Sequence, residues 1–575
     1  MLATATDVLN GSAPPLRLML DEESTGVLEG NHNGVRAFIW GQVFDEDRRA
    51  LSPEALCQRV ATGAGISGLR GHYALVLVDG NGARVRIVSD RFVTRRLYYT
   101  LVQGEVWVSD SISCLRRALP DSPSIAPQAV LDYLFFHMVP SPDTIYEGIY
   151  ALAPAEVAEV KAGRLERYRH WKPIFTADTH ADEQAQAGLL FSTLEAAVTD
   201  TLDETPTGCF LSGGLDSSSI AGLVARKRPG VPVFSIGFPL EQYNELDYAR
   251  CAVERFGLTG HEYCMYPEDV VEALPTIIDS MDQPFGNSSV LPTYFCARLA
   301  KSHGVDRLIA GDGGDELFAG NVRYSKQLQM DRWRQRLGPL VPLLAGGLLN
   351  SQVPSRPAIL RKGKSFVRQL RMSVTENLEY FNFLNLIDRR SVFAEALLGS
   401  LDLKEPERRC QRLYDELPQA DTLDRMLYMD WKHTLADNDL VKVSSACRLA
   451  NIEVAYPMLD DGLVDLSLCL PARLKLTPNN LRHLYKVAMS DFLPQRIINK
   501  PKHGFGLPFG LWTQNHPELR AQAHAALDGL KAYNLFQPRF LDEVKRLHQH
   551  EHAKHYGELV WVLMVLSLWL DRNQQ

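Results

Sequence analysis

The stretch FLSGGLDSSSIAGL, Phe210 to Leu223, decides the fold of the larger, C-terminal part of this chain. Gly208–Leu211, which overlaps the start of this stretch, is typical of the end of a buried strand. Ile220–Ala225, at its other end, is typical of a helix with a small-residue face. A strand, a glycine-rich turn and a helix N-terminus form the arrangement in which α/β proteins bind phosphate. Backbone N–H groups and the positive end of the helix then face the anion.

The side chains of this turn are suited to the same task. Gly213 and Gly214 allow positive φ and close approach of the backbone, and Asp216 is a candidate helix cap and magnesium ligand. The hydroxyl donors are Ser212, Ser217 and Ser218. The stretch lacks the spacing and the lysine of a Walker A loop, so it belongs to another kind of phosphate site.

Composition narrows the class of protein. A chain of 575 residues with 45% apolar and 23% charged residues is expected to form two or three globular domains. A net charge of −8 argues against nucleic acid or an anionic membrane as the main partner. The nine cysteines show no CxxC pair and no zinc spacing, so neither a disulfide framework nor a structural metal is indicated.

No targeting or membrane segment is predicted. The first 20 residues lack a basic region followed by a long apolar core, so they do not form a signal peptide. The apolar runs Leu337–Leu349 and Leu559–Leu570 are too short to span a bilayer and are predicted to be buried helices. The expected location is the cytoplasm.

The first 170 residues or so are predicted to be β-rich. Short apolar strands separated by Asp, Gly and Asn turns are expected at 35–44, 72–79, 84–90, 96–102 and 105–110. A polar segment, Thr176–Gln186, is predicted to be a linker. The expected domains are therefore residues 1–175 and residues 185–575.

The second domain alternates strands and helices. Strands are expected at 231–238 and 306–312 and a helix at 290–303, which predicts βαβ units and a parallel sheet. From about residue 325 the chain is predicted to be mostly helical. A basic patch there favours a solvated helix face over a site for an acidic substrate or peptide; it comprises Arg356, Arg361, Lys362, Lys364, Arg368 and Arg371.

Several motifs in a fixed order carry a resemblance to a known family. The opening turn resembles the SGGxDS pyrophosphate loop of the N-type ATP pyrophosphatases. It is followed by SIGFPLEQYNELDYAR (235–250), MDQPFGNSSVLPTYFCARLA (281–300), IAGDGGDELFAG (309–320), IEVAYPMLDDGLVDL (452–466) and INKPKHGFGLPFGLW (498–512). This series resembles the synthetase domain of class B, glutamine-type asparagine synthetases.

The N-terminal part resembles that family's amidotransferase domain through GHYALVLVD (71–79), SDRFVTRRLYYT (89–100) and VWVSDSISCL (106–115). The implied fold is an α+β region followed by an α/β region. An Ntn-hydrolase-like β-sandwich without its nucleophile precedes an ATP-pyrophosphatase domain of the adenine nucleotide alpha hydrolase type. That second domain has a parallel sheet with helical additions.

One departure changes the expected activity. Glutamine-hydrolysing members begin with a cysteine whose thiolate attacks the amide, whereas this chain begins Met1-Leu2-Ala3 and its first cysteine is Cys57. The family's HRGPD stretch is missing, and Trp40-Gly41-Gln42-Val43 replaces NGEIYN. We expect no glutaminase activity and a domain kept as scaffold or reused for binding. A misassigned start codon is the weaker alternative.

The resemblance also implies roles for site residues, with ATP and Mg²⁺ as cofactors. The residues expected to bind ATP or pyrophosphate are Leu211, Ser212, Gly213, Gly214, Asp216, Ser217, Ser218, Ser235, Ile236, Gly237 and Gly311. Asp216 and Asp315 would be the magnesium carboxylates. Lys502 would stabilise pyrophosphate and the tetrahedral intermediate.

Asp312 is the expected general base for the incoming amine, at a position where asparagine synthetases typically carry glutamate and β-lactam synthetases tyrosine. A helix cap or a second metal ligand is its alternative role. Glu453 is expected to be catalytic and Asp460 to lie near the substrate. Ala455 replaces a family arginine and Ser444 a family aspartate, which puts aspartate as the substrate in doubt.

The expected function is an ATP-dependent, AMP-forming amide ligase without its own glutaminase. Its partners would be a small-molecule or peptide carboxylate and an amine, with no nucleic acid and no membrane; a homodimer or a biosynthetic partner protein stays open. The alternatives are a lasso-peptide macrocyclase or β-lactam-type cyclase, and an asparagine synthetase that uses free ammonia. Two further alternatives belong to other classes of protein: an ATP pyrophosphatase that modifies tRNA or transfers sulfur, and a non-catalytic ATP-binding scaffold. The net negative charge and the scattered cysteines argue against the tRNA- or sulfur-modifying enzyme.

Overall fold

The computed structural model describes residues 16–21, 26–79, 84–337, 358–478, 480–502 and 506–573, without the side chains of 358–362. Several stretches singled out in the sequence lie outside the described residues. They are Met1–Ala3, most of the run 337–349, Arg356 with the side chains of Arg361 and Lys362, and residues 503–505 of the KHGFG stretch.

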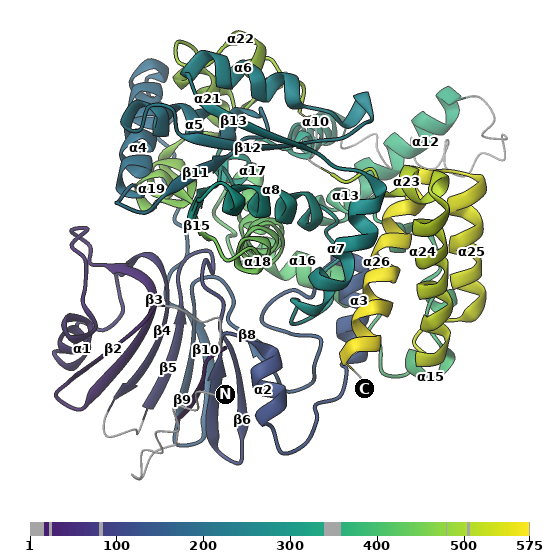
Figure 1. Ribbon diagram of the computed structural model, residues 1–575, viewed down its shortest axis with the longest axis horizontal. Coiled ribbons are helices and arrows are strands. Elements are labelled where there is room, and N and C mark those ends of the chain that lie inside the picture. Colours follow the sequence, from purple (N-terminus) through teal and green to yellow (C-terminus); the bar gives the residue numbers. More distant parts are fainter. Residues whose placement is uncertain are drawn as a thin grey trace.

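The N-terminal region is a two-layer β-sandwich (Figure 1). One sheet has the order β1-β7-β6-β8 and the other the order β10-β9-β5-β4-β3-β2. The strands are β1 (Leu16–Met19), β2 (Val27–His32), β3 (Val35–Phe44), β4 (Arg70–Asp79), β5 (Arg84–Ser89), β6 (Tyr98–Val102), β7 (Glu105–Ser109), β8 (Tyr150–Ala151), β9 (Glu156–Lys161) and β10 (Arg164–Arg169). The β-rich prediction is confirmed.

Alternation of side chains explains why the two sheets pack face to face. Val76 and Ile87 of the larger sheet share one buried cluster with Val106 and Val108 of the smaller sheet. The other face of the larger sheet is covered by α1 (Pro53–Ala61), whose Leu56 and Cys57 are fully buried. Apolar residues of the larger sheet are therefore buried on both faces, against the smaller sheet on one face and against α1 on the other.

A five-stranded parallel sheet forms the centre of the C-terminal region, as the alternating pattern predicted. Its order is β13-β12-β11-β14-β15, from β11 (Thr207–Phe210), β12 (Pro232–Gly237), β13 (Thr259–Cys264), β14 (Arg307–Ile309) and β15 (Glu453–Ala455). The chain winds in one direction from β11 to β13 and then returns to the other side of β11. In such sheets a crevice opens at the carboxyl ends of the two central strands.

Helices cover both faces of this sheet. Figure 1 shows α5 (Leu215–Lys227) and α6 (Leu246–Phe256) on one side and α8 (Val290–Ser302) and α18 (Leu440–Leu449) on the other. The linker prediction is partly wrong, because α4 (Glu183–Asp200) already includes Glu183–Gln186. Asp182 caps that helix by accepting a hydrogen bond from Ala185 N at 2.8 Å, so the helix begins earlier than its apolar residues indicate.

The helical additions follow as predicted. Those before β15 are α7 (Pro267–Asp279), α9 (Gly314–Phe318), α10 (Val322–Leu337), α12 (Ala358–Arg371), α13 (Val374–Leu378), α14 (Phe383–Leu386), α15 (Glu395–Leu398), α16 (Glu405–Asp415), α17 (Thr422–Asp430) and the π-helix η4 (Trp431–Asp439). Those after β15 are η5 (Pro457–Leu459), α19 (Asp461–Cys469), α20 (Ala472–Lys475), α21 (His483–Ala488) and α22 (Gln495–Ile498). A C-terminal group of helices follows, with α23 (Phe509–Asn515), α24 (Pro517–Gly529), α25 (Pro538–His550) and α26 (Ala553–Asn573). The run Leu559–Leu570 lies within α26 and is almost entirely buried, as predicted.

Among the residues that the structure describes, no helix combines the length and apolar character needed to cross a membrane.

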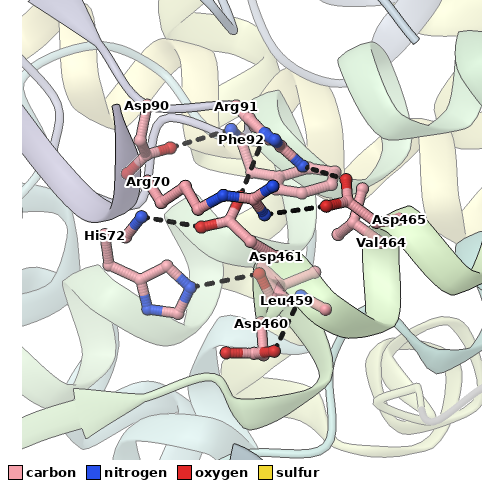
Figure 2. A network of polar contacts seen from close by, with 12 residues as sticks. Arg70, His72, Asp90, Arg91, Phe92, Leu459, Asp460, Asp461, Val464 and Asp465 are labelled. Atoms are coloured by element: carbon pink, nitrogen blue, oxygen red, sulfur yellow. Dashed lines mark hydrogen bonds and ion pairs between the residues drawn. The ribbon is translucent and has the colours of Figure 1, made fainter. Parts of the chain in front are cut away.

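The two regions are joined by packed helices and by an ion-pair network. Figure 1 shows α3 (Pro127–Phe136) of the N-terminal region beside α26, and Tyr133 OH donates to Val562 O at 2.8 Å. Figure 2 shows the network, in which Arg91 pairs with Asp461 and Asp465 at 3.0 and 2.9 Å. Because these carboxylates lie on α19, the N-terminal region is fixed to the chain that follows β15.

Candidate active site

Two glycine-rich turns meet at the crevice between β11 and β14. A Cβ atom on Gly311 would lie 3.0 Å from Asp216 Cβ, and one on Gly314 would lie 2.2 Å from Asp216 Oδ1. A side chain at Gly314 would therefore displace the Asp216 carboxylate. The turns of the SGGLDS and GDGGDE stretches, separated by some hundred residues, form one surface.

The first turn is held by its own polar groups. Gly213 has a φ of 67°, and a Cβ there would lie 2.4 Å from Ala249 N, so a side chain is excluded both by conformation and by space. Ser212 Oγ lies 3.0 Å from Ser217 Oγ and accepts from Gly214 N at 3.3 Å. Gly214 is the N-cap of α5 and has no side chain to cap it, which leaves the first-turn N–H groups available to an anion.

Four charged side chains form a neutral quartet beside this turn: Asp216, Asp315, Arg482 and Lys502. Arg482 Nη1 donates to Asp216 Oδ1, and Arg482 Nη2 lies 3.1 Å from Asp315 Oδ1. Lys502 Nζ donates to Asp315 Oδ2. The sequence expected both carboxylates and Lys502 in one site, and the structure brings them together.

Burial and charge act on these groups in opposite directions. Burial raises the pKa of Asp216, although Arg482 opposes the shift. Burial also favours the neutral form of Asp315, but Arg482 and Lys502 outweigh it and hold the pKa of that carboxyl below its usual value. The guanidinium therefore neutralises two carboxylates that repel one another.

The carboxylate pair fits a magnesium ion. Mg²⁺ is usually bound by one or two carboxylates, with phosphate and water completing the octahedron. Asp315 Oδ1 is buried and accepts no hydrogen bond, although Arg482 Nη2 lies 3.1 Å away as an ion-pair partner. Among the described residues, no group of three or more His, Cys, Asp and Glu side chains could hold a metal. Asp216 and Asp315 would hold such an ion, and the remaining ligands would come from phosphate and water.

Asp312 lies in the GDGGDE turn, as Asp315 does, on the side facing Lys442 of α18. Its carboxylate is 3.9 Å from Lys442 Nζ, which also binds Asp439 at 2.7 Å. Burial raises the pKa of Asp312 to about 6, with Lys442 opposing and Asp439 reinforcing the shift. A carboxyl with this pKa is mostly ionised at neutral pH and is a stronger base than an exposed aspartate.

Two uncharged polar side chains, Ser444 and Tyr456, also lie near Asp312, in addition to the charged Lys442 and Asp439. Ser444 Oγ and Tyr456 OH are 2.8 Å apart. Ala455 O accepts from Ala310 N at 3.0 Å, which places Ala455 beside the start of the GDGGDE turn. Ser444 and Ala455, at the positions where the family carries aspartate and arginine, are thus both uncharged residues near the GDGGDE turn.

Two expected carboxylates lie elsewhere. Glu453 opens β15 and pairs in register with Arg307, whose Nη2 is 3.1 Å from Glu453 Oε2; this is the amino edge of the sheet, roughly 10 Å of strand away from the turn. The expectation of a catalytic Glu453 is therefore corrected. Asp460 caps α19 and binds Arg48 of the N-terminal region at 2.7 Å, so it belongs to the domain contact.

Several expected nucleotide contacts belong to the framework of the site. Ser235 Oγ donates to Leu211 O at 2.6 Å, which uses both groups to join the ends of β12 and β11. Leu211, Ile236 and Ser218 are buried, and Ser218 is entirely inaccessible. Gly237 is buried too, because a Cβ there would lie 2.4 Å from Leu246 Cδ1. The expectation of direct contact is corrected for Ser218 and for the Leu211 side chain.

Three basic residues of the site were missed: Lys442, Arg482 and Lys500. Lys500 Nζ donates to Ser212 O at 3.3 Å and pairs with Glu245 at 3.1 Å. The Lys500-Pro501-Lys502 spacing could have shown Lys500. Nothing local marks Arg482, which follows the hairpin of β16 (Leu476–Thr477) and β17 (Asn480–Leu481) in left-handed conformation, with a φ of 56°.

Fold and site together define an α/β protein with two glycine-rich turns and a helix N-terminus at the carboxyl edge of a parallel sheet, preceded by an N-terminal β-sandwich. Residues 190–571 match the family described as asparagine synthase, and residues 56–171 match the glutamine amidotransferase domain. The chain belongs to the asparagine synthase family.

Relatives agree over most of the chain. A Mycobacterium tuberculosis protein named as a glutamine-hydrolysing asparagine synthetase is 27% identical over 517 residues, which cover 87% of this chain and 76% of that protein. Glutamine-hydrolysing asparagine synthetase 1 of Bacillus subtilis is 24% identical over 519 residues, covering 88% and 78%. A solved structure titled as the allosteric regulatory enzyme of purine biosynthesis superimposes with a TM-score of 0.17, at 10% identity over 42% of this chain and 62% of that chain, which is too low to inform the fold.

Proposed function

We propose that this protein is an ATP-dependent ligase that adenylates a substrate carboxylate and transfers the acyl group to an amine or to ammonia. The observation that carries the proposal is the meeting of two glycine-rich turns with Asp216, Asp315, Lys502 and Asp312 in one crevice. Membership of the asparagine synthase family supports ATP-dependent amidation as the chemistry.

Adenylation would proceed at the first turn. A carboxylate oxygen attacks the α-phosphorus of ATP, the bond from that phosphorus to the oxygen bridging the β-phosphate breaks, and pyrophosphate leaves. Ser212, Gly214 and the N-terminus of α5 would hold the departing pyrophosphate, and the ammonium of Lys502, which is paired with Asp315, would neutralise part of its charge. Magnesium bound by Asp216 and Asp315 would neutralise phosphate charge.

Amide formation would use Asp312. The amine nitrogen attacks the acyl carbon, its proton passes to an Asp312 carboxylate oxygen, the bond between the acyl carbon and the AMP oxygen breaks, and AMP leaves. Lys442, 3.9 Å from Asp312 and held by Asp439, limits how far burial raises the pKa of this carboxyl. The base is then deprotonated at neutral pH yet basic enough to accept the proton.

We also propose that the protein has no glutaminase of its own. The N-terminal region contains Cys57 and Cys114, and both are buried, with pKa values raised by burial. Cys57 Sγ donates to Gly30 O at 3.5 Å, beneath the larger sheet. Cys114 Sγ accepts from Arg117 Nη2 at 3.4 Å, but burial still raises the pKa of this thiol. Neither thiol is exposed in the way that a nucleophilic cysteine needs to be.

The uncharged residues Ser444 and Ala455, at the two positions where the family carries aspartate and arginine, favour a carboxylate other than aspartate. Ser444, Ala455 and Tyr456 offer no charge to an α-amino acid head group. A peptide or small-molecule carboxylate fits these residues better, and an intramolecular amide, as in β-lactam synthetases and lasso-peptide macrocyclases, is the second candidate. An ammonia-dependent asparagine synthetase is the third.

The first experiment measures AMP and pyrophosphate release from Mg-ATP and aspartate, with glutamine in one reaction and ammonium in the other. Asparagine and AMP with ammonium alone would establish an ammonia-dependent synthetase. No AMP, from protein that binds ATP, would point to another carboxylate, and peptide cyclisation would be tested next. ATP binding without AMP from any carboxylate would leave the non-catalytic scaffold.

Asp216→Ala and Asp315→Ala are the matching variants. Each is expected to abolish AMP formation, because the pyrophosphate would lose its metal clamp. Glu453→Ala, on the same sheet but at its opposite edge, is the control and is expected to keep AMP formation near the wild-type rate. AMP release from the Asp216/Asp315 double variant would remove the assignment.

A further inference from the structure

Arg482 makes the contacts that a bound cation would make. Its two terminal nitrogens reach Asp216 Oδ1 and, at 3.1 Å, Asp315 Oδ1, and its side chain is only 7% exposed. The two carboxylates come from the turns after β11 and β14, so a single guanidinium joins the two halves of the crevice. A planar fork of donors is the side-chain group best suited to span two carboxylates.

The backbone at Arg482 is held in an unfavourable conformation to achieve this. With φ 56° and ψ 44° it lies in the left-handed region, which a residue with a Cβ rarely adopts. Strained positions of this kind persist where the surroundings require them, typically at ligand sites. Here the following residue starts α21, so the strained turn aims the side chain from the end of the β16–β17 hairpin into the crevice.

The charges leave little room for a metal beside this guanidinium. Asp216 and Asp315 contribute two negative charges, and Arg482 and Lys502 contribute two positive ones, so the quartet is neutral. A free magnesium ion would add two uncompensated positive charges to a poorly solvated site. A triphosphate would bring the missing negative charge and would also attract the guanidinium.

We propose that Arg482 occupies the cation position between Asp216 and Asp315 until Mg-ATP arrives, and that it is then exchanged from the carboxylates to the phosphates. This inference rests on the proposed function. Arg482 would make the site selective for metal bound to nucleotide over free metal, and it would bind the triphosphate once displaced.

The test uses the full-length protein and needs no knowledge of the carboxylate substrate. Binding of Mn²⁺ alone is followed by loss of its EPR signal, since carboxylate and phosphate sites accept Mn²⁺ in place of Mg²⁺. Binding of Mg-ATP is measured by isothermal titration calorimetry. Arg482→Met is expected to tighten Mn²⁺ binding by about tenfold or more and to weaken Mg-ATP binding by about tenfold or more.

Arg307→Met is the matched control. Arg307 also pairs with two carboxylates, Asp203 at 2.8 Å and Glu453 at 3.1 Å, but at the opposite edge of the same sheet. It should leave both affinities within about twofold of wild type. If Arg482→Met does not fold, Arg482→Lys replaces it, since a lysine keeps the charge but contacts one carboxylate at a time; both shifts should then keep their signs and be smaller.

Opposite shifts for Mn²⁺ and Mg-ATP would support the exchange. Weakening of both would make Arg482 a structural clamp, and weaker Mg-ATP binding with unchanged Mn²⁺ binding would make it a phosphate ligand only; either result overturns the proposal, as does no change. Wild-type protein that does not bind Mg-ATP would instead refute the proposed function.

Discussion

At the scale of the residue, Asp312 differs from the glutamate that asparagine synthetases typically carry by one methylene. Its carboxylate lies 3.9 Å from Lys442, whose ammonium is held 2.7 Å from Asp439. The shorter side chain is thus part of a fixed arrangement of charges. This arrangement separates the role in amide formation that we propose for Asp312 from the metal-binding role that we propose for Asp216 and Asp315.

Asp312→Asn is expected to keep adenylation and to slow amide formation by about 10²-fold or more, because an amide cannot accept the proton. Adenylation is followed by exchange of labelled pyrophosphate into ATP, and amide formation by product release. Both proteins keep Glu316, the buried last residue of the GDGGDE stretch, so that they differ only at position 312. Equal loss of both steps would make Asp312 a metal ligand or a structural residue.

The pH dependence of amide formation follows from the same carboxyl group. Asp312 acts as a base only when ionised, so the rate should rise with pH through a midpoint near the pKa of about 6. Lys442 lowers the pKa of Asp312, and Lys442→Met should therefore move the midpoint to higher pH. A pH–rate profile with an unmoved midpoint in this variant would show that another group sets the acidic limb.

At the scale of the element, the π-helix η4 connects the N-terminal region to the site. Asp437 accepts from Arg96 Nη2 at 2.9 Å and from the N and Oγ of Ser141, each at 2.9 Å. Trp431 Nε1 donates to Glu316 O at 3.0 Å, in the helix of the GDGGDE turn. Asp439, the last residue of η4, and Lys442, in the first turn of α18, lie beside Asp312, so the contacts of η4 with both regions hold them in place.

Asp437→Ala is expected to destabilise the protein by about 3–5 kcal/mol, because it leaves the mostly buried Arg96 guanidinium without its carboxylate. The free energy of unfolding is measured from urea titrations. Asp528→Ala, at an exposed ion pair with Lys531 and Lys545, is the control and should cost less than about 1 kcal/mol. Similar losses in the two variants would contradict the anchoring role of Asp437.

At the scale of the whole molecule, the N-terminal region is part of one body with the synthetase region. In Figure 2 Arg91, Arg70 and His72 all reach the segment from Leu459 to Asp465. Leu459 also touches the site, since a Cβ on Gly313 would lie 2.4 Å from its Cδ2. The N-terminal region therefore contacts a segment that itself lies against the GDGGDE turn.

Arg91→Met is expected to weaken the contact between the two regions. The guanidinium pairs with Asp461 and Asp465 and lies 4.4 Å from the Trp171 ring, and all three contacts would be lost. Differential scanning calorimetry should show one transition for the wild type and two for the variant. A single, unshifted transition in both proteins would show that the other contacts between the regions, such as Arg96 with Asp437 and α3 with α26, suffice to couple them.

Glutamate release from glutamine tests whether the N-terminal region hydrolyses glutamine. We expect none above background, and no change in Cys57→Ser, because that thiol is buried and its pKa is raised. Hydrolysis that is lost in Cys57→Ser would contradict the proposal that the region lacks a glutaminase.

The sequence by itself determined the features that depend on neighbours in the chain. The alternating strands of the sandwich, the strand–turn–helix at Phe210–Leu223 and the glycine-rich GDGGDE turn all follow from short-range patterns, because turns and periodicity are local properties. Tertiary structure decided what lies opposite them. Parallel pairing placed Glu453 beside Arg307 at the far edge of the sheet, and the packing of the segment between β17 and α21 brought Arg482 to Asp216 across 266 residues of chain. Such contacts depend on the register and packing of distant elements, which no local pattern records.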